Sequence, residues 1–73
     1  MSDETVDARG LSCPEPVLLS KAAIERIGRG TVDVLVDTVT SRENVARMAR
    51  TLSCMVEEKE ADDGSYVLSI TKE

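Results

Sequence analysis

The side chains best suited to chemistry in this 73-residue chain lie near its start, in the segment Cys13-Pro14-Glu15-Pro16. An apolar stretch that reads as a helix follows, although two prolines so close together normally break a helix. The first N–H groups of a helix have no partner within it, so prolines there cost no hydrogen bond. The motif therefore predicts a helix whose N-cap is Cys13 or, with Glu15 completing a capping box, Ser12.

Either N-cap puts Cys13 at the first turn, where the positive end of the helix dipole favours a thiolate over a thiol. Helix N-termini are among the environments in which a cysteine becomes a reactive nucleophile. The alternative is that Cys13 is a small buried hydrophobic residue and that the prolines merely start the helix, since free cysteines are often buried and inert. The motif by itself leaves both interpretations open.

The composition excludes several classes of function. The chain has no histidine, which removes histidine acid–base catalysis and the commonest metal ligand, and two cysteines cannot build a zinc site within one chain. A net charge of -5 with nine scattered basic residues argues against nucleic-acid binding. The apolar runs are too short to span a membrane, and the acidic start MSDETVD does not resemble an export signal. We therefore expect a cytoplasmic protein with no cofactor, no metal and no membrane contact.

The pattern of apolar residues predicts six elements. Val32, Val34 and Val36 alternate with other residues along a strand, and an Asp-Gly pair before the last strand indicates a hairpin. Thr40 and Glu43 have capping-box spacing at the start of a second helix. The expected order is strand, helix, strand, helix, strand, strand, at residues 4–8, 14–27, 31–37, 41–52, 54–60 and 66–72. Two helices laid on one face of a four-stranded sheet follow from this order.

The crossover rule predicts what surrounds the thiol. If the first two strands run parallel, the second helix begins at the same edge of the sheet as the first. Thr40, Ser41 and Arg42 should then lie near Cys13, and Arg9 is close to it in sequence. We therefore expect an electropositive pocket on a chain that is otherwise acidic.

The second cysteine, Cys54, is predicted to be a core residue. It lies between the second helix and the third strand, among apolar neighbours. The chain enters the second helix near Cys13 and leaves it a helix length away, so the two sulfurs should be beyond disulfide range. We expect no internal disulfide, and this geometry argues against a dithiol redox protein.

The segments ARGLSCPEPVLLSKAAIE and DTVTSRENVARMA, joined by a valine-rich strand, resemble the TusA-like (SirA/YedF-like) family of small sulfur-carrier proteins. The signature of that family is Cys-Pro-x-Pro at the start of the first helix, and the second segment is most similar to the YedF-like branch. The resemblance implies a single domain over residues 1–73, folded as an α/β two-layer sandwich with a mixed four-stranded sheet. It also implies that Cys13 accepts a sulfane sulfur as a persulfide and passes it on.

The first hypothesis is therefore a persulfide relay in sulfur or selenium metabolism, with tRNA thiolation as one candidate pathway, rather than an independent turnover enzyme. The implied partners are a sulfur donor protein, a cysteine desulfurase or a rhodanese-like protein, and an acceptor protein, with the carrier a monomer. The residues expected to position or bind the sulfur around Cys13 are Pro14, Glu15, Pro16, Arg9, Ser41 and Arg42. The second hypothesis is a non-catalytic regulatory interaction module that uses the acidic run at 57–63, with Cys13 structural.

Overall fold

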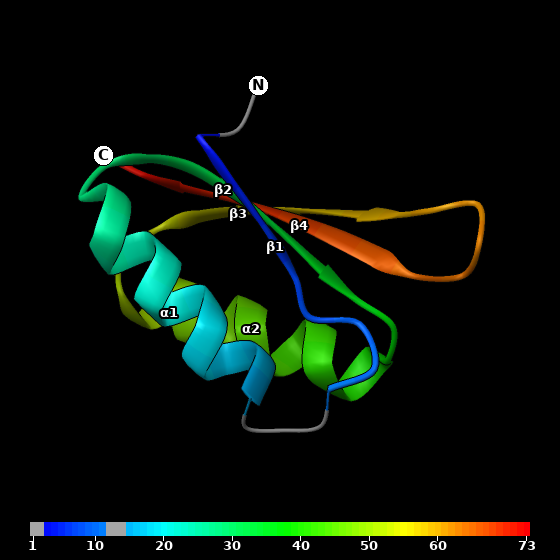
Figure 1. Cartoon of the computed structure of the whole chain (residues 1–73). Helices are drawn as coiled ribbons and strands as arrows, with labels where there is room; N and C mark the ends of the chain where they lie inside the picture. Colours follow the sequence, from blue (N-terminus) through cyan, green and yellow to red (C-terminus); the bar gives the residue numbers. More distant parts are fainter. Residues whose placement is uncertain (1–2, 12–14) are drawn as a thin grey trace.

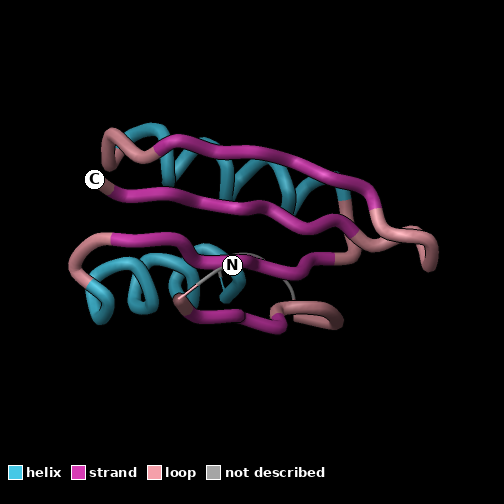
Figure 2. The backbone as a smooth tube through the Cα atoms, turned by 90° about the horizontal axis from the view of Figure 1, so that it is seen from above, coloured by secondary structure: helices cyan, strands magenta, loops and turns pink. Residues whose placement is uncertain are grey.

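The computed structural model describes residues 3–11 and 15–73. Within the described residues, two helices form one layer and four strands form the other, as Figures 1 and 2 show for their arrangement. The order β-α-β-α-β-β and the two-layer α/β fold predicted from the sequence are confirmed. The elements are β1 (Glu4–Asp7), α1 (Glu15–Ile27), β2 (Gly30–Val36), α2 (Val39–Thr51), β3 (Met55–Glu60) and β4 (Tyr66–Lys72).

The sheet is mixed, with strand order β1-β2-β4-β3. β1 pairs with β2 in parallel, and both β2 and β3 pair with β4 antiparallel. The register puts Val34 opposite Val6 on one side and opposite Leu68 on the other. Because β1 and β2 run the same way, their carboxyl ends meet at one edge of the sheet, as the prediction for the second helix required.

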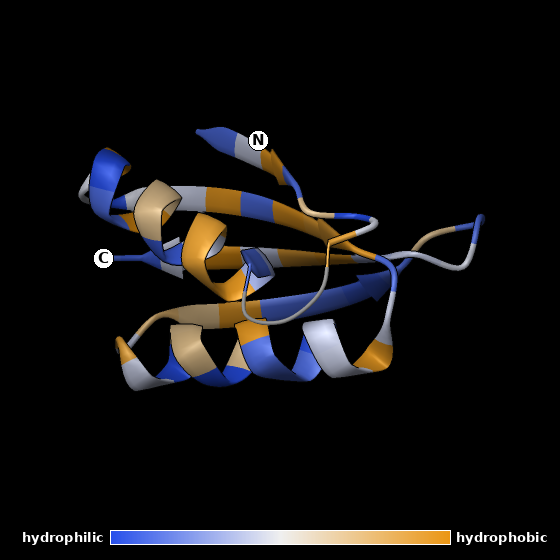
Figure 3. Cartoon of the chain, turned by 60° about the horizontal axis from the view of Figure 1, so that its bottom comes forward, coloured by the Kyte–Doolittle hydropathy of each residue, from blue (hydrophilic) through white to orange (hydrophobic). Residues whose placement is uncertain are grey.

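The core lies between the sheet and the helices, and it is aliphatic because the chain has no tryptophan or phenylalanine. The predicted alternation along β2 is confirmed, since Val32, Val34 and Val36 are fully buried. Apolar and polar bands alternate along the strands in Figure 3, as expected for a sheet with one covered face. The other buried members of the core are Ala8, Ala23, Ile24, Val45, Ala46, Ala49, Cys54, Leu68 and Ile70.

The start of α2 differs from the prediction. Its N-cap is Thr38, whose Oγ1 accepts a hydrogen bond from the Ser41 backbone N–H at 3.1 Å, so the expected capping box of Thr40 and Glu43 is wrong. Two threonines at this loop can both serve as N-caps. Thr38 is the N-cap because α2 begins at Val39, only three residues after Val36, the last residue of β2.

Neither helix in the described part of the chain is long and apolar enough to cross a membrane.

Candidate functional site

Cys13 and Pro14, two of the predicted site residues, lie outside the described residues. The chain is described up to Leu11 before them and from Glu15, the first residue of α1, after them. Both helices begin at the edge of the sheet where the parallel strands β1 and β2 end (Figure 1). We call residues 8–11, 15–16 and 37–42 the carboxyl edge, and these residues are the described surroundings of the candidate site.

The loop that leads toward the cysteine motif is held by β2 and by the residue that follows it. The Gly10 N–H donates to Asp37 Oδ2 at 2.9 Å, and the Ala8 N–H donates to the Leu35 carbonyl at 2.8 Å. Gly10 has a φ of 79°, in the left-handed region that favours glycine. The two loops that precede the two helices are therefore joined directly.

Asp37 was not among the predicted site residues. The signal that could have identified it is its position, because functional loops in α/β sheets cluster at the carboxyl ends of parallel strands. Asp37 immediately follows such a strand.

Arg9 is engaged by two carboxylates. Its Nε and Nη2 donate to the two carboxylate oxygens of Asp7, each at 2.9 Å, and its Nη1 lies 3.6 Å from Asp63 Oδ2 in the β3–β4 loop. The hydrogen bonds from Arg9 lower the pKa of Asp7 to about 2, and the same pairing raises the pKa of Arg9. Arg9 therefore links the loop after β1 to the β3–β4 hairpin, and its positive charge is compensated locally.

Arg42 is also held by the β3–β4 hairpin. Its Nε is 3.2 Å from Glu58 Oε1, and its guanidinium carbon lies 4.8 Å from the centre of the Tyr66 ring, a cation–π arrangement. The buried Nε makes no hydrogen bond within the described residues, so the contact with Glu58 is an ion pair alone. Arg42 thus ties the first turn of α2 to β3 and β4.

The expectation of an electropositive pocket around Cys13 stays a prediction, because Cys13 lies outside the described residues, but these contacts show how its two predicted cations are engaged. Arg9 and Arg42, the two cations on which it rested, are each paired with acidic residues of the chain itself. The sequence could not show the contacts with Asp63 and Glu58, because these two residues come from a hairpin far along the chain, whereas Asp7 is only two residues from Arg9.

Ser41 and Glu15 lie at the first turns of the two helices. Ser41 is buried, and its backbone N–H is used by the Thr38 cap. Glu15 is exposed, and an acidic residue in the first turn of α1 interacts favourably with the helix dipole. Thr40, expected as the cap, is exposed.

Pro16 has a structural role that the sequence did not predict. Its side chain is fully buried, and its carbonyl accepts a hydrogen bond from the buried Ser20 hydroxyl at 2.6 Å. Pro16 therefore packs into the core as well as fixing the backbone at the start of α1.

Pro16→Ala should destabilise the domain by about 2 kcal/mol while leaving it folded. The substitution removes two buried carbons and increases the conformational entropy of the unfolded chain. The helix keeps all its hydrogen bonds, because proline has no backbone N–H to lose. Urea unfolding of the variant and of the wild-type protein measures the difference. An unchanged midpoint would show that the buried ring contributes nothing to stability, contrary to its packing.

Cys54 is confirmed as a core residue. It is 7% exposed and carries a free thiol, and its Sγ lies 3.8 Å from the Leu52 carbonyl oxygen. Its separation from Cys13 involves a residue outside the described ranges. Within those ranges, no group of three or more acidic or thiol side chains is arranged to hold a metal ion.

Comparison with known proteins gives two results. The family model for sulfurtransferase TusA matches residues 4–72, nearly the whole chain. The crystal structure of a SirA-like protein from Desulfitobacterium hafniense is similar, with a TM-score of 0.90 and 38% sequence identity. The match covers 93% of this chain and 95% of that one.

Proposed function

Because this chain belongs to the TusA family of sulfurtransferases, we propose that it carries sulfane sulfur as a persulfide on Cys13 and passes it to an acceptor protein. The observation that carries the proposal is the family match, which spans the segment reading Cys13-Pro14-Glu15-Pro16. The proposed donor is a cysteine desulfurase or a rhodanese-like protein, and the proposed setting is a cytosolic relay by a single-domain monomer.

The proposed chemistry is thiol exchange. The Cys13 thiolate attacks the terminal sulfur of a donor persulfide, the new S–S bond forms on Cys13, and the donor leaves as a thiolate. Repeating the exchange, an acceptor thiolate takes the terminal sulfur and restores the Cys13 thiolate. A persulfide anion at the start of a helix is stabilised as other anions are there. No histidine is needed for either step.

The contacts at the carboxyl edge support a revised role for the predicted arginines. In this proposal Arg9 and Arg42 order the loops and first turns around the motif, because their charges are already paired with acidic residues. Asp37 contributes to the same ordering, because its carboxylate accepts a hydrogen bond from the Gly10 N–H. Pro16 anchors the start of α1 in the core. Electrostatic support for a persulfide then comes chiefly from the helix start.

Incubation with each of three sulfur sources tests this function. These are a cysteine desulfurase with cysteine, a rhodanese with thiosulfate, and inorganic polysulfide. Intact-mass measurement should show a gain of about 32 Da per sulfur with at least one source, and dithiothreitol should remove it. If none of the three sources adds mass, the carrier function is wrong, since an accessible thiolate reacts with the smallest of them. That outcome is the one an interaction module without sulfur chemistry would give.

A further inference from the structure

Helix α2 is a positively charged element of an acidic protein. The chain has a net charge of -5, yet α2 carries Arg42, Arg47 and Arg50 against the single acidic residue Glu43. The acidic residues collect elsewhere, above all in the segment 57–63. The helix therefore presents the reverse charge to the rest of the molecule.

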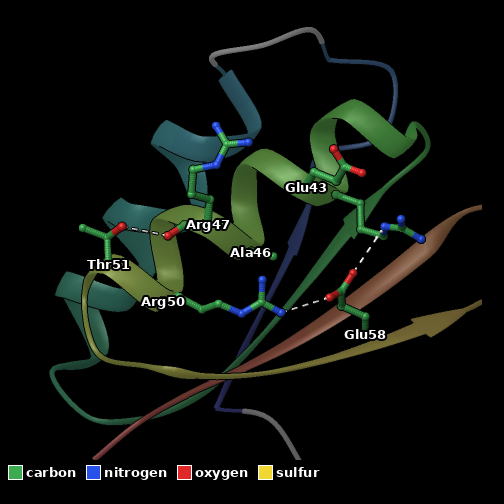
Figure 4. Close-up of a pocket in the computed structure, with 7 residues that line it drawn as sticks. Glu43, Ala46, Arg47, Arg50, Thr51 and Glu58 are labelled. Atoms are coloured by element: carbon green, nitrogen blue, oxygen red, sulfur yellow. Dashed lines mark hydrogen bonds and ion pairs between the residues drawn. The ribbon is translucent and has the colours of Figure 1, made fainter.

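A groove of about 600 Å³ runs between α2 and the edge strand β3. All three arginines of α2 line it, together with two acidic residues, Glu43 of α2 and Glu58 of β3. In Figure 4 Arg50 reaches across to Glu58, whereas Arg47 extends away from it. Ala46, which lies between Arg42 and Arg47 in the sequence, also lines the groove, and its small side chain leaves space for side chains of a partner.

The arginines in this groove have more hydrogen-bond donors than the protein satisfies. Arg50 Nη2 is 3.3 Å from Glu58 Oε2, so Arg42 and Arg50 share one carboxylate although each guanidinium has five N–H donors. Arg47 is exposed and forms no ion pair within the described residues. Arg50 has 62% of its side chain exposed. Two guanidinium groups are thus available to a ligand without breaking the packing of α2 on the sheet.

We propose that the groove between α2 and β3 docks an acidic segment of a partner protein, whose carboxylates pair with Arg47 and Arg50. Guanidinium groups bind carboxylates in a matched planar geometry, and charged rims of this kind steer and orient a partner. The docking surface does not depend on sulfur chemistry at Cys13, so either proposal can fail without the other.

A short acidic peptide fits the groove better than a nucleic acid does. A polyphosphate backbone extends beyond the groove, where it would meet the net negative charge of the chain. Among the described residues, no aromatic side chain lines the groove to stack on a base. A few carboxylates need only the local positive charge that α2 supplies.

The test is a titration of the isotope-labelled protein with blocked octaglutamate at low ionic strength, followed by amide chemical shifts in NMR spectra. Shifts should concentrate at residues 42–51 and at 58. Arg47→Glu with Arg50→Glu should weaken binding by at least about tenfold, because two attractive pairs become repulsive. The matched control is Arg29→Glu with Lys72→Glu, which changes the net charge equally outside the groove and should bind like the wild-type protein.

Three outcomes would overturn the docking surface: shifts spread away from α2, equal weakening in both double variants, or tighter binding of decauridylate than of octaglutamate at α2. Should the glutamate variant lose its fold, Arg47→Gln with Arg50→Gln replaces it, and a smaller loss of affinity confined to this pair supports the proposal. Unchanged affinity in that folded variant counts against it.

Discussion

Replacement of Cys13 by serine should abolish sulfur loading from every donor, whereas replacement of Cys54 by serine should leave loading unchanged. Serine differs from cysteine only in having oxygen in place of sulfur, and its hydroxyl cannot form a persulfide by thiol exchange. Cys54 lies in the core at 7% exposure, where a donor protein cannot approach its sulfur. Intact-mass measurement after incubation with a desulfurase and cysteine detects the added sulfur. Peptide mapping then locates the adduct of about 32 Da.

Comparison of the two variants shows which cysteine carries the sulfur, even if the buried thiol of Cys54 is reactive. Equal loading of Cys13→Ser and wild-type protein would move the chemistry to Cys54 and refute the assignment. Loss of loading in both variants would indicate that transfer needs both thiols. Thermal unfolding of each variant is the control, because Cys54→Ser introduces a hydroxyl into the core and lowers stability without touching the motif.

The fold was predictable because its strongest patterns are local. The alternation of Val32, Val34 and Val36 matches the period of a strand with one covered face, and these residues are fully buried. Gly28, directly after α1, has a φ of 74°, the left-handed conformation in which a glycine commonly ends a helix. The antiparallel pairing of β3 with β4 follows from the Asp-Gly turn between them.

The details at the carboxyl edge were less predictable, and the reasons differ from residue to residue. The structure buries Pro16 and leaves Val17 half-buried, because which side of α1 is covered depends on how the helix packs on the sheet. Glu58, the partner of Arg42, and Asp63, the second partner of Arg9, depend on the register of a hairpin that comes later in the chain. Long flexible side chains carry no sequence signal for such pairing.

The packing of α1 on the sheet predicts the second large effect, a loss of stability of the domain. Ile24→Ala should lower the free energy of unfolding by about 2–5 kcal/mol, the range for truncating a fully buried aliphatic side chain. Ile24 is 1% exposed and packs in the core between α1 and the sheet. A chain of 73 residues has a total stability of only about 4–11 kcal/mol, so this loss is a large fraction of it.

The matched control for Ile24→Ala is Leu18→Ala on the same helix. Leucine and isoleucine are isomers, so both changes remove the same atoms and leave alanine, but Leu18 is 59% exposed. Its truncation should change stability by no more than about 0.5 kcal/mol, as for most surface substitutions. Urea midpoints of the two variants compare the effects, and similar losses would mean that α1 is not anchored through Ile24. Because α1 carries Glu15 and Pro16, the last two residues of the cysteine motif, loading at Cys13 should fall with the folded fraction in Ile24→Ala and stay at the wild-type level in Leu18→Ala.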